Sequence, residues 1–217
     1  MRSLDDLLNV ADPAWPLLRQ EIGRASNPVD VLPPTPTTAA DLHRLQVTVR
    51  STLGAVVYET GGLLIDHGWV RLLGSGDDRL GRSLVSWNLI CGLIVPGDSL
   101  LLVGDDAVGG LFAVNAGRFA GPPGEIHYFA PDSLAWDSLG LGYSEFVAFL
   151  LNGDLAEFYG NTRWDGWQAE VAAMAGHQAM SIYPPLWAKA SKSGERSRRP
   201  VPLQELVGLT GALETRP

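Results

Sequence analysis

A series of short apolar runs, separated by turn residues and followed directly by a helical pattern, most constrains what this chain can fold into. Three such runs lie in its middle: 100–103, 110–114 and 126–129. Asp105-Asp106 and Gly109-Gly110 separate the first two runs, and a helix opens at 142–146. Connections this short join antiparallel neighbours, because a parallel crossover needs a dozen or more residues. The pattern predicts an α+β fold with a mostly antiparallel central sheet flanked by helices.

The first 53 residues are expected to be mainly helical. Ser3, followed by Asp5 and Asp6, is typical of a helix start. A second helix is expected from Pro16 to about Ala25, and a third after Thr37 or Thr38. The four prolines of residues 27–36 predict a loop or extended chain there.

From Gly54 onward the pattern predicts strands and then helices. The short β-prone runs before the central series are 55–58, 63–65 and 69–73, with an exposed loop over 74–82. Helices are expected to end at Asn152-Gly153, with a left-handed cap, and to span 155–159 and 164–175.

We predict a single domain over 1–217. Its parts are a mainly helical segment 1–53, an α+β core 54–187, a basic surface loop 188–199 and a C-terminal segment 200–217. The basic loop holds several lysines and arginines among serines, with Glu195 as the opposing charge. Such a loop is either a solvated surface or a contact for an anion or an acidic partner.

Composition excludes several classes of protein. The formal net charge of −8 disfavours binding of the whole molecule to a nucleic-acid backbone. A single cysteine, Cys91, excludes a disulfide framework. The acidic first ten residues do not resemble a signal peptide, and no window reaches the roughly 18 apolar residues of a membrane span. We therefore expect a soluble, cytoplasmic protein that does not bind membranes.

Catalytic chemistry has little support in the sequence. The four histidines show no metal-ligand spacing, and alternation in its strand predicts that His127 points away from the core. Asp105, Asp106 and Asp132 stand at strand ends, where they would hold a cation or do acid–base work if the fold brought them together. Alternatively, they satisfy backbone N–H groups of turns. We predict no catalytic, metal-binding or cofactor-binding residue.

Eight blocks of this sequence together resemble a bacterial family known as domain of unknown function 2625. They are spread over almost the whole chain in order: Asp12–Leu18, Thr60–Trp69, Asp105–Ala113, Tyr128–Asp132, Gly142–Phe146, Asn152–Leu155, Arg163–Trp167 and Tyr183–Trp187. The resemblance implies a shared fold and brings no reaction, cofactor or catalytic residue with it.

A shorter stretch is similar to the Smi1/Knr4 (SUKH) superfamily. The comparable residues are Asp105, Asp106 and Gly110, then strand 126–129, then helix 144–151. That resemblance implies a SUKH-like α+β core, to which this chain adds its helical N-terminal part. Many bacterial members of the superfamily resemble immunity proteins, which neutralise toxins by binding them.

Three functions therefore stand as hypotheses. The first is a non-enzymatic protein-binding module, with immunity-like neutralisation of a toxin as its specific form, because its acidic charge suits a basic toxin. The second is a structural or regulatory homo-oligomer that uses some of the seven tryptophans, and the third is a metal-dependent enzyme using Asp105, Asp106 and Asp132. The candidate partner-contacting residues are Asp105, Asp106, His127, Asp132, Trp136, Arg196, Arg198 and Arg199.

Overall fold

Two antiparallel sheets organise the chain in the computed structural model, which describes residues 1–94, 97–189 and 196–214. The seven-stranded sheet has the order β1-β2-β3-β4-β5-β6-β7, so each strand pairs with its neighbours in the chain. Its strands are β1 Val29–Leu32, β2 Gly62–Ile65, β3 Val70–Leu73, β4 Leu100–Asp106, β5 Leu111–Asn115, β6 Glu125–Ala130 and β7 Ala135–Gly142. The second sheet is the hairpin of β8 Gln178–Tyr183 and β9 Ser197–Pro202. The predicted α+β fold with an antiparallel sheet is confirmed.

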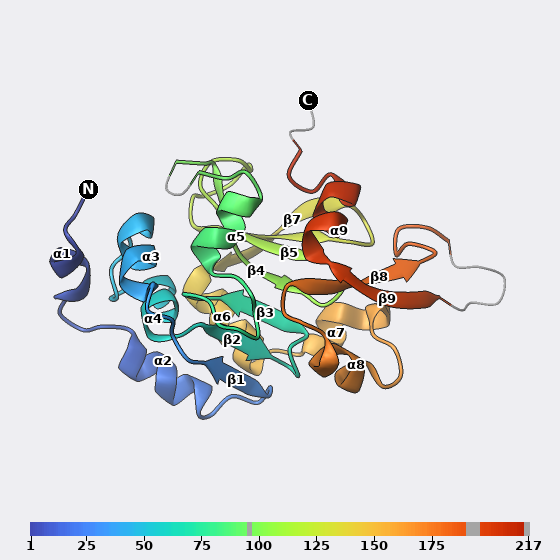
Figure 1. Cartoon of the computed structure of the whole chain (residues 1–217), viewed down its shortest axis with the longest axis horizontal. Helices are drawn as coiled ribbons and strands as arrows, with labels where there is room; N and C mark the ends of the chain where they lie inside the picture. Colours follow the sequence, from blue (N-terminus) through green and yellow to red (C-terminus); the bar gives the residue numbers. More distant parts are fainter. Residues whose placement is uncertain (95–96, 190–195, 215–217) are drawn as a thin grey trace.

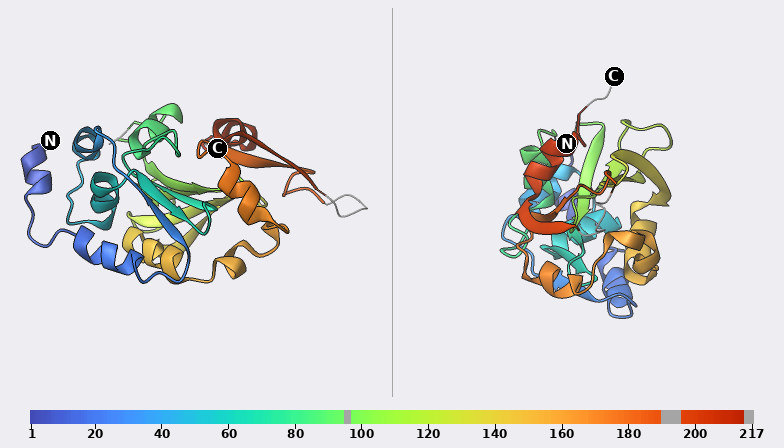
Figure 2. Two further views of the ribbon diagram at one scale, coloured as in Figure 1. Left: turned by 60° about the horizontal axis from the view of Figure 1, so that its bottom comes forward. Right: turned by 90° about the vertical axis from the view of Figure 1, so that its right-hand side faces the viewer.

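Helices surround the large sheet and gather at its two ends (Figures 1 and 2). Those of the described residues are α1 Leu4–Leu8, α2 Trp15–Ile22, α3 Thr38–Leu45, α4 Thr52–Glu59, α5 Leu84–Ile90, α6 Tyr143–Asn152, α7 Leu155–Tyr159, the 3-10 turn η1 Gly160–Thr162, α8 Trp167–Ala173 and α9 Leu203–Thr210. The N-terminal helices lie at the opposite end of the sheet from the β8–β9 hairpin. None of the helices seen in the described ranges is long and apolar enough to cross a membrane.

The core lies on both faces of the central strands. Every residue of β3 is buried, as are six of the seven residues of β4. Trp69, Phe112 and Phe146 are among the largest fully buried side chains. Because central strands covered on both faces lack polar alternation, they appear in the sequence as continuous apolar runs.

Several predicted boundaries are confirmed. Ser3 caps α1 by accepting a hydrogen bond from the Asp6 N–H, and the Asp6 carboxylate accepts one from the Ser3 N–H in return. Helix α7 spans the predicted residues 155–159, and α6 ends at Asn152 as predicted. The predicted left-handed cap at Gly153 is wrong, because that residue is extended with φ −76° and ψ 165°.

The predicted strand at 55–58 is wrong, since these residues lie in helix α4. The Ser51 hydroxyl accepts a hydrogen bond from the Gly54 N–H at 3.0 Å and so caps the helix. Ala55, Val56 and Val57 are all fully buried, which gives a helix the same continuous apolar run as a buried strand.

Four further elements were not predicted as such. Helix α5 and strands β7, β8 and β9 lie in segments whose patterns are too short or too polar to identify an element. Strand β9 includes Ser197, Arg198 and Arg199 of the predicted basic loop, while residues 190–195 of that loop lie outside the described residues.

A buried cluster of three charges ties the two sheets together. The Asp105 carboxylate on β4 forms an ion pair with Arg71 Nε on β3 at 2.7 Å. It also accepts a hydrogen bond from Arg82, which lies in the loop after β3. Arg71 also donates to the carbonyl of Gln178 at 2.5 Å, and Arg82 donates to that of Gly176. Burial lowers the pKa of Arg82, and the Asp105 carboxylate opposes that shift. The cluster thus anchors the beginning of β8 to the centre of the large sheet.

Replacing Asp105 tests how much this cluster stabilises the fold. Asp105→Asn keeps the shape of the side chain but leaves two buried guanidinium groups without a counter-charge. We expect the free energy of unfolding to fall by about 3–5 kcal/mol, measured by urea denaturation at pH 7. The exposed Asp137→Asn variant is the control and is expected to change it by less than about 0.5 kcal/mol. Equal stability of the two variants would contradict the assignment.

Candidate functional site

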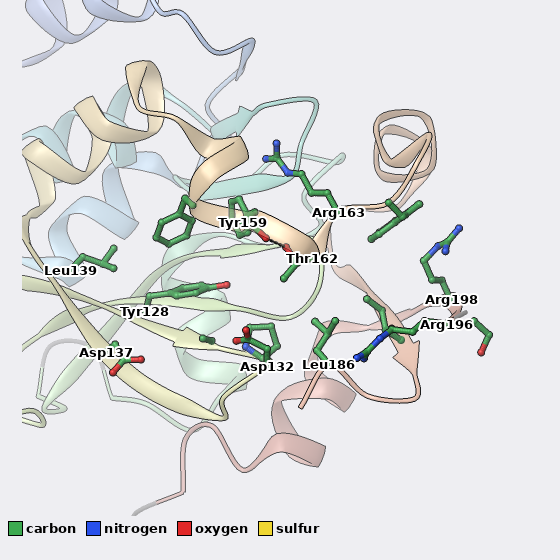
Figure 3. Close-up of a pocket in the computed structure, with 17 residues that line it drawn as sticks. Tyr128, Asp132, Asp137, Leu139, Tyr159, Thr162, Arg163, Leu186, Arg196 and Arg198 are labelled. Atoms are coloured by element: carbon green, nitrogen blue, oxygen red, sulfur yellow. Dashed lines mark hydrogen bonds between the residues drawn. The ribbon is translucent and has the colours of Figure 1, made fainter. Parts of the chain in front are cut away.

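A large hollow lies between the C-terminal half of the large sheet, α7 and the β8–β9 hairpin (Figure 3). This space, called the main cavity below, has a volume of about 1150 Å³. Its wall combines aromatic side chains with charges of both signs. Its polar and charged lining includes Tyr128, Asp132, Asp137, Arg163, Arg196 and Arg198.

Strands β6 and β7 supply the acidic wall of the main cavity. Tyr128 and Asp137 face each other in the register of the two strands, so their side chains lie on the same face of the sheet. Asp132 lies in the turn that joins these strands. Both aspartates are exposed, and no described residue forms an ion pair with either carboxylate. Their negative charge is therefore available to a ligand.

Arg163 is enclosed by aromatic rings at the opposite wall. Its guanidinium carbon lies 4.3 Å from the ring centroid of Trp167, 4.9 Å from that of Trp69 and 5.1 Å from that of Tyr159. One terminal nitrogen pairs with the Asp66 carboxylate at 2.6 Å. Cation–π contacts and a partly buried ion pair hold this side chain, so its charge is already compensated.

The two arginines of the hairpin region also have partners. Arg198 lies 4.8 Å from the ring centroid of Trp164 and pairs with Glu170 at 3.3 Å. Arg196 donates to the backbone carbonyls of Pro184, Pro185 and Ala188 at 2.5–3.1 Å. Because the arginines are engaged and the aspartates are not, the cavity is better suited to a positively charged ligand than to an anion.

A buried carboxylate orients Tyr128 behind the acidic wall. Asp106 Oδ2 accepts the Tyr128 hydroxyl at 2.7 Å, and Oδ1 accepts the N–H groups of Val108 at 3.0 Å and Gly110 at 2.8 Å. Burial raises the pKa of Asp106, against the lowering effect of these donors. Burial and the neighbouring Asp106 raise the pKa of Tyr128. The phenol therefore stays protonated, and it donates its proton inward to Asp106.

Gly110 is required at this point of the turn between β4 and β5. A Cβ atom there would lie 2.1 Å from Asp106 Oδ2 and 2.5 Å from the Tyr128 hydroxyl. Only a residue without a side chain leaves room for this hydrogen bond.

The structure brings together three of the eight sequence-predicted partner residues. Asp132, Arg196 and Arg198 line the main cavity. Arg199 is exposed on β9 opposite Ser181 and is not among the residues that line it.

The prediction that Asp105 and Asp106 contact a partner is wrong, because both side chains are fully buried. Asp105 serves the internal charge cluster. Asp106 satisfies the N–H groups of the following turn, as the turn interpretation predicted.

His127 and Trp136 lie on the face of the sheet opposite the main cavity. The prediction that His127 points away from the core is wrong, since it is only 4% exposed. Its ring stacks on Phe119 with the centroids 4.3 Å apart, and Phe119 also contacts Trp136. The Trp136 Nε1–H donates to the Ala212 carbonyl at 2.8 Å. The loop before β6 and the segment after α9 cover this face, which alternation within one strand does not indicate.

Sequence reasoning missed four important cavity residues, namely Tyr128, Asp137, Arg163 and Trp164. Tyr128 and Arg163-Trp164 fall within the blocks that carry the family resemblance, which was the signal available for them. Asp137 had no such signal, because β7 was not predicted.

No metal site is formed by the residues that the structure describes. Among them, no three His, Cys, Asp or Glu side chains are placed to hold a metal ion. The Asp105 carboxylate is occupied by two arginines and that of Asp106 by a tyrosine and two N–H groups. The geometry thus gives no support to an enzyme that uses these aspartates.

Sequence similarity to known proteins extends over almost the whole chain. The family profile described as "Protein of unknown function DUF2625" matches residues 4–206. An uncharacterised protein of Escherichia coli K12, YbfG, is 41% identical over 207 residues, which cover 95% of this chain and 94% of that protein. An uncharacterised protein of Haemophilus influenzae Rd is 39% identical over 189 residues, 86% of this chain and 83% of that protein. No solved structure matches the chain significantly.

Substituting Asp106 with asparagine tests the state of the buried carboxylate. The amide keeps the acceptor oxygen for the turn and donates to Tyr128 Oη in place of accepting from it, so we expect Asp106→Asn to fold. The raised pKa means that the native state binds the proton more tightly than the unfolded chain. Below the ordinary pKa of 3.8 both states are protonated, and the wild type carries no penalty relative to the variant.

As pH rises above 3.8, the wild type is expected to lose stability relative to Asp106→Asn, by at most about 1.4 kcal/mol per pH unit until Asp106 ionises in the native state. Urea unfolding of both proteins between pH 4 and pH 8 measures this difference. A wild type that gains stability over the variant with rising pH would show that the pKa is lowered instead.

Proposed function

We propose a function for this chain on the premise that it belongs to the DUF2625 family, whose profile covers residues 4–206. The chain is a protein-binding module, and its main cavity receives a positively charged segment of another protein. The proposal rests on one observation. The carboxylates of Asp132 and Asp137 are exposed at the cavity and form no ion pair with a described residue. Around them, Arg163 and Arg198 are paired with carboxylates, and Arg196 donates to backbone carbonyls.

The size and lining of the main cavity support a segment of a protein as the ligand. Typical small-molecule sites span about 300–1000 Å³, and the main cavity, at about 1150 Å³, exceeds that range. Its aromatic residues Phe158 and Trp164 offer apolar contact area beside the two carboxylates. Aromatic anchors with a charged rim are typical of protein interfaces.

The overall charge of the molecule supports the same choice of partner. A net charge of −8 attracts a basic protein over distances up to the Debye length and raises the rate of association. The narrower proposal is that this partner is a basic toxin, neutralised by binding. It draws on the resemblance of residues 105–151 to the SUKH superfamily, many of whose bacterial members are similar to immunity proteins.

A second candidate function, a homo-oligomeric structural or regulatory subunit, is favoured by an apolar patch on the other side of the hairpin. Tyr183, Trp187 and Leu209 are 72%, 42% and 70% exposed, and they surround a groove of about 140 Å³. Light scattering at high protein concentration separates the two proposals. A stable oligomer that dissociates in Leu209→Ser would favour the subunit, whereas a monomer would remove it.

A charge-matched pair of variants tests the proposed binding site. Nonapeptides selected from a displayed random library against the wild type are expected to be rich in lysine and arginine. Because Asp132→Asn/Asp137→Asn removes both unpaired carboxylates, it should weaken these peptides at least about tenfold, which corresponds to about 1.4 kcal/mol. Fluorescence anisotropy with labelled peptides measures the dissociation constants.

The control is Asp12→Asn/Glu21→Gln, which changes the net charge equally at exposed positions near α2. It should leave the affinities within about twofold. Equal weakening in both double variants would mean that net charge alone attracts the peptides. Selected peptides without basic residues would contradict the proposal directly.

A further inference from the structure

Strand β7 is one free edge of the seven-stranded sheet. In the strand order it is bonded to β6 and to no other described strand. The regular register covers Ala135 to Ser138, which face Ala130 to His127 of β6. Beyond it, a bulge opposite Glu125 and His127 bends the strand. Along this regular stretch, alternate backbone N–H and C=O groups point away from β6.

Strands β1 and β9, which also lie at sheet edges, are blunted by proline, but β7 is not. Pro28 and Pro33 flank β1 directly, and Pro200 and Pro202 lie within β9. Proline removes a backbone donor and deters the pairing of another strand. Strand β7 contains no proline, lysine or arginine, and its single charged residue is Asp137.

A hollow lies on each face of this edge. On one face, Asp137 and Leu139 line the main cavity. On the other face, Trp136 and Phe119 line a second hollow of about 350 Å³. Side chains of a strand point alternately to the two faces of a sheet. A strand added beside β7 would therefore place one set of its side chains at each hollow.

The chemistry of the two hollows differs. The main cavity offers the carboxylates of Asp132 and Asp137. The second hollow is lined mainly by the apolar side chains of Phe119, Phe129, Leu134 and Trp136. A segment that fits both would alternate basic and apolar residues.

We infer that the partner's positively charged segment binds as an extended strand along β7, with basic side chains in the main cavity and apolar side chains at Trp136. The inference rests on the proposed function and adds the mode of binding and the sequence pattern that the site selects. Main-chain hydrogen bonds supply affinity, and the two hollows supply specificity.

A second copy of this chain is a poorer occupant than a basic partner. Pairing two β7 strands in antiparallel register would bring the Asp137 carboxylates of both copies to the same edge. Like charges placed close together across a strand pair are destabilising. Charge complementarity thus favours a foreign basic strand.

Peptides of one composition and two patterns test the inference. The probe is an acetylated, amidated nonapeptide that alternates lysine and valine, labelled for fluorescence anisotropy. Its isomer carries the five lysines in one block and the four valines in the other. We expect the alternating peptide to bind the wild type at least tenfold more tightly, and Asp132→Asn/Asp137→Asn to abolish that preference.

Backbone methylation provides the matched control. Two versions of the alternating peptide carry N-methyl groups, one on the central lysines and the other on the central valines. In strand addition, one alternate set of amides faces β7 and the other faces solvent. One version should therefore lose at least tenfold in affinity and the other much less.

The outcomes separate this inference from the proposed function. Strand addition is overturned if the two isomers bind with equal affinity, or if neither methylation changes the affinity. If Asp132→Asn/Asp137→Asn still weakens binding in that case, the cavity remains a site for a basic segment that is not an added strand. No binding of either peptide, or binding independent of both aspartates, counts against the proposed function as well. A dimer that the alternating peptide dissociates would show that a second copy occupies β7 and would overturn the inference.

Discussion

The ion cluster of Asp105 with Arg71 and Arg82 is the interaction on which the rest of the structure depends. One buried carboxylate holds two guanidinium groups, and these in turn hold the carbonyls of Gly176 and Gln178. Removing charges from water is costly, so such a cluster stabilises a fold only when every partner is present. It fixes where β8 begins, and so fixes the hairpin that forms one side of the main cavity.

The contacts of the cavity's arginines determine which of its charges remain available to a ligand. Aromatic rings and Asp66 enclose Arg163, Trp164 and Glu170 hold Arg198, and backbone carbonyls hold Arg196. Each of these contacts belongs to the packing of the C-terminal segments against the sheet. A count of the charged residues alone would describe the cavity as basic. Its arginines, however, have partners within the protein, whereas the carboxylates of its acidic wall form no ion pair with a described residue.

Much of the fold could be predicted from the sequence, but less of the site. Short apolar runs between turn residues indicate antiparallel strands, and this holds for β2 to β6. The run at 55–58 was misassigned, because a buried helix and a buried strand give the same apolar pattern over four residues. Asp132, Arg196 and Arg198 were found as candidates. Asp105, Asp106 and His127 proved buried, since alternation within one strand cannot tell what later segments place over each face.

The neighbour-to-neighbour order of β1 to β7 has a consequence for how the protein folds during its synthesis on the ribosome. Each strand of the large sheet can pair as soon as its successor leaves the exit tunnel, because every pairing is between strands adjacent in the chain. The hairpin and α9 are made last and dock on a sheet already formed. The main cavity is therefore completed only at the end of synthesis, so a nascent chain would form the large sheet well before it could bind a partner.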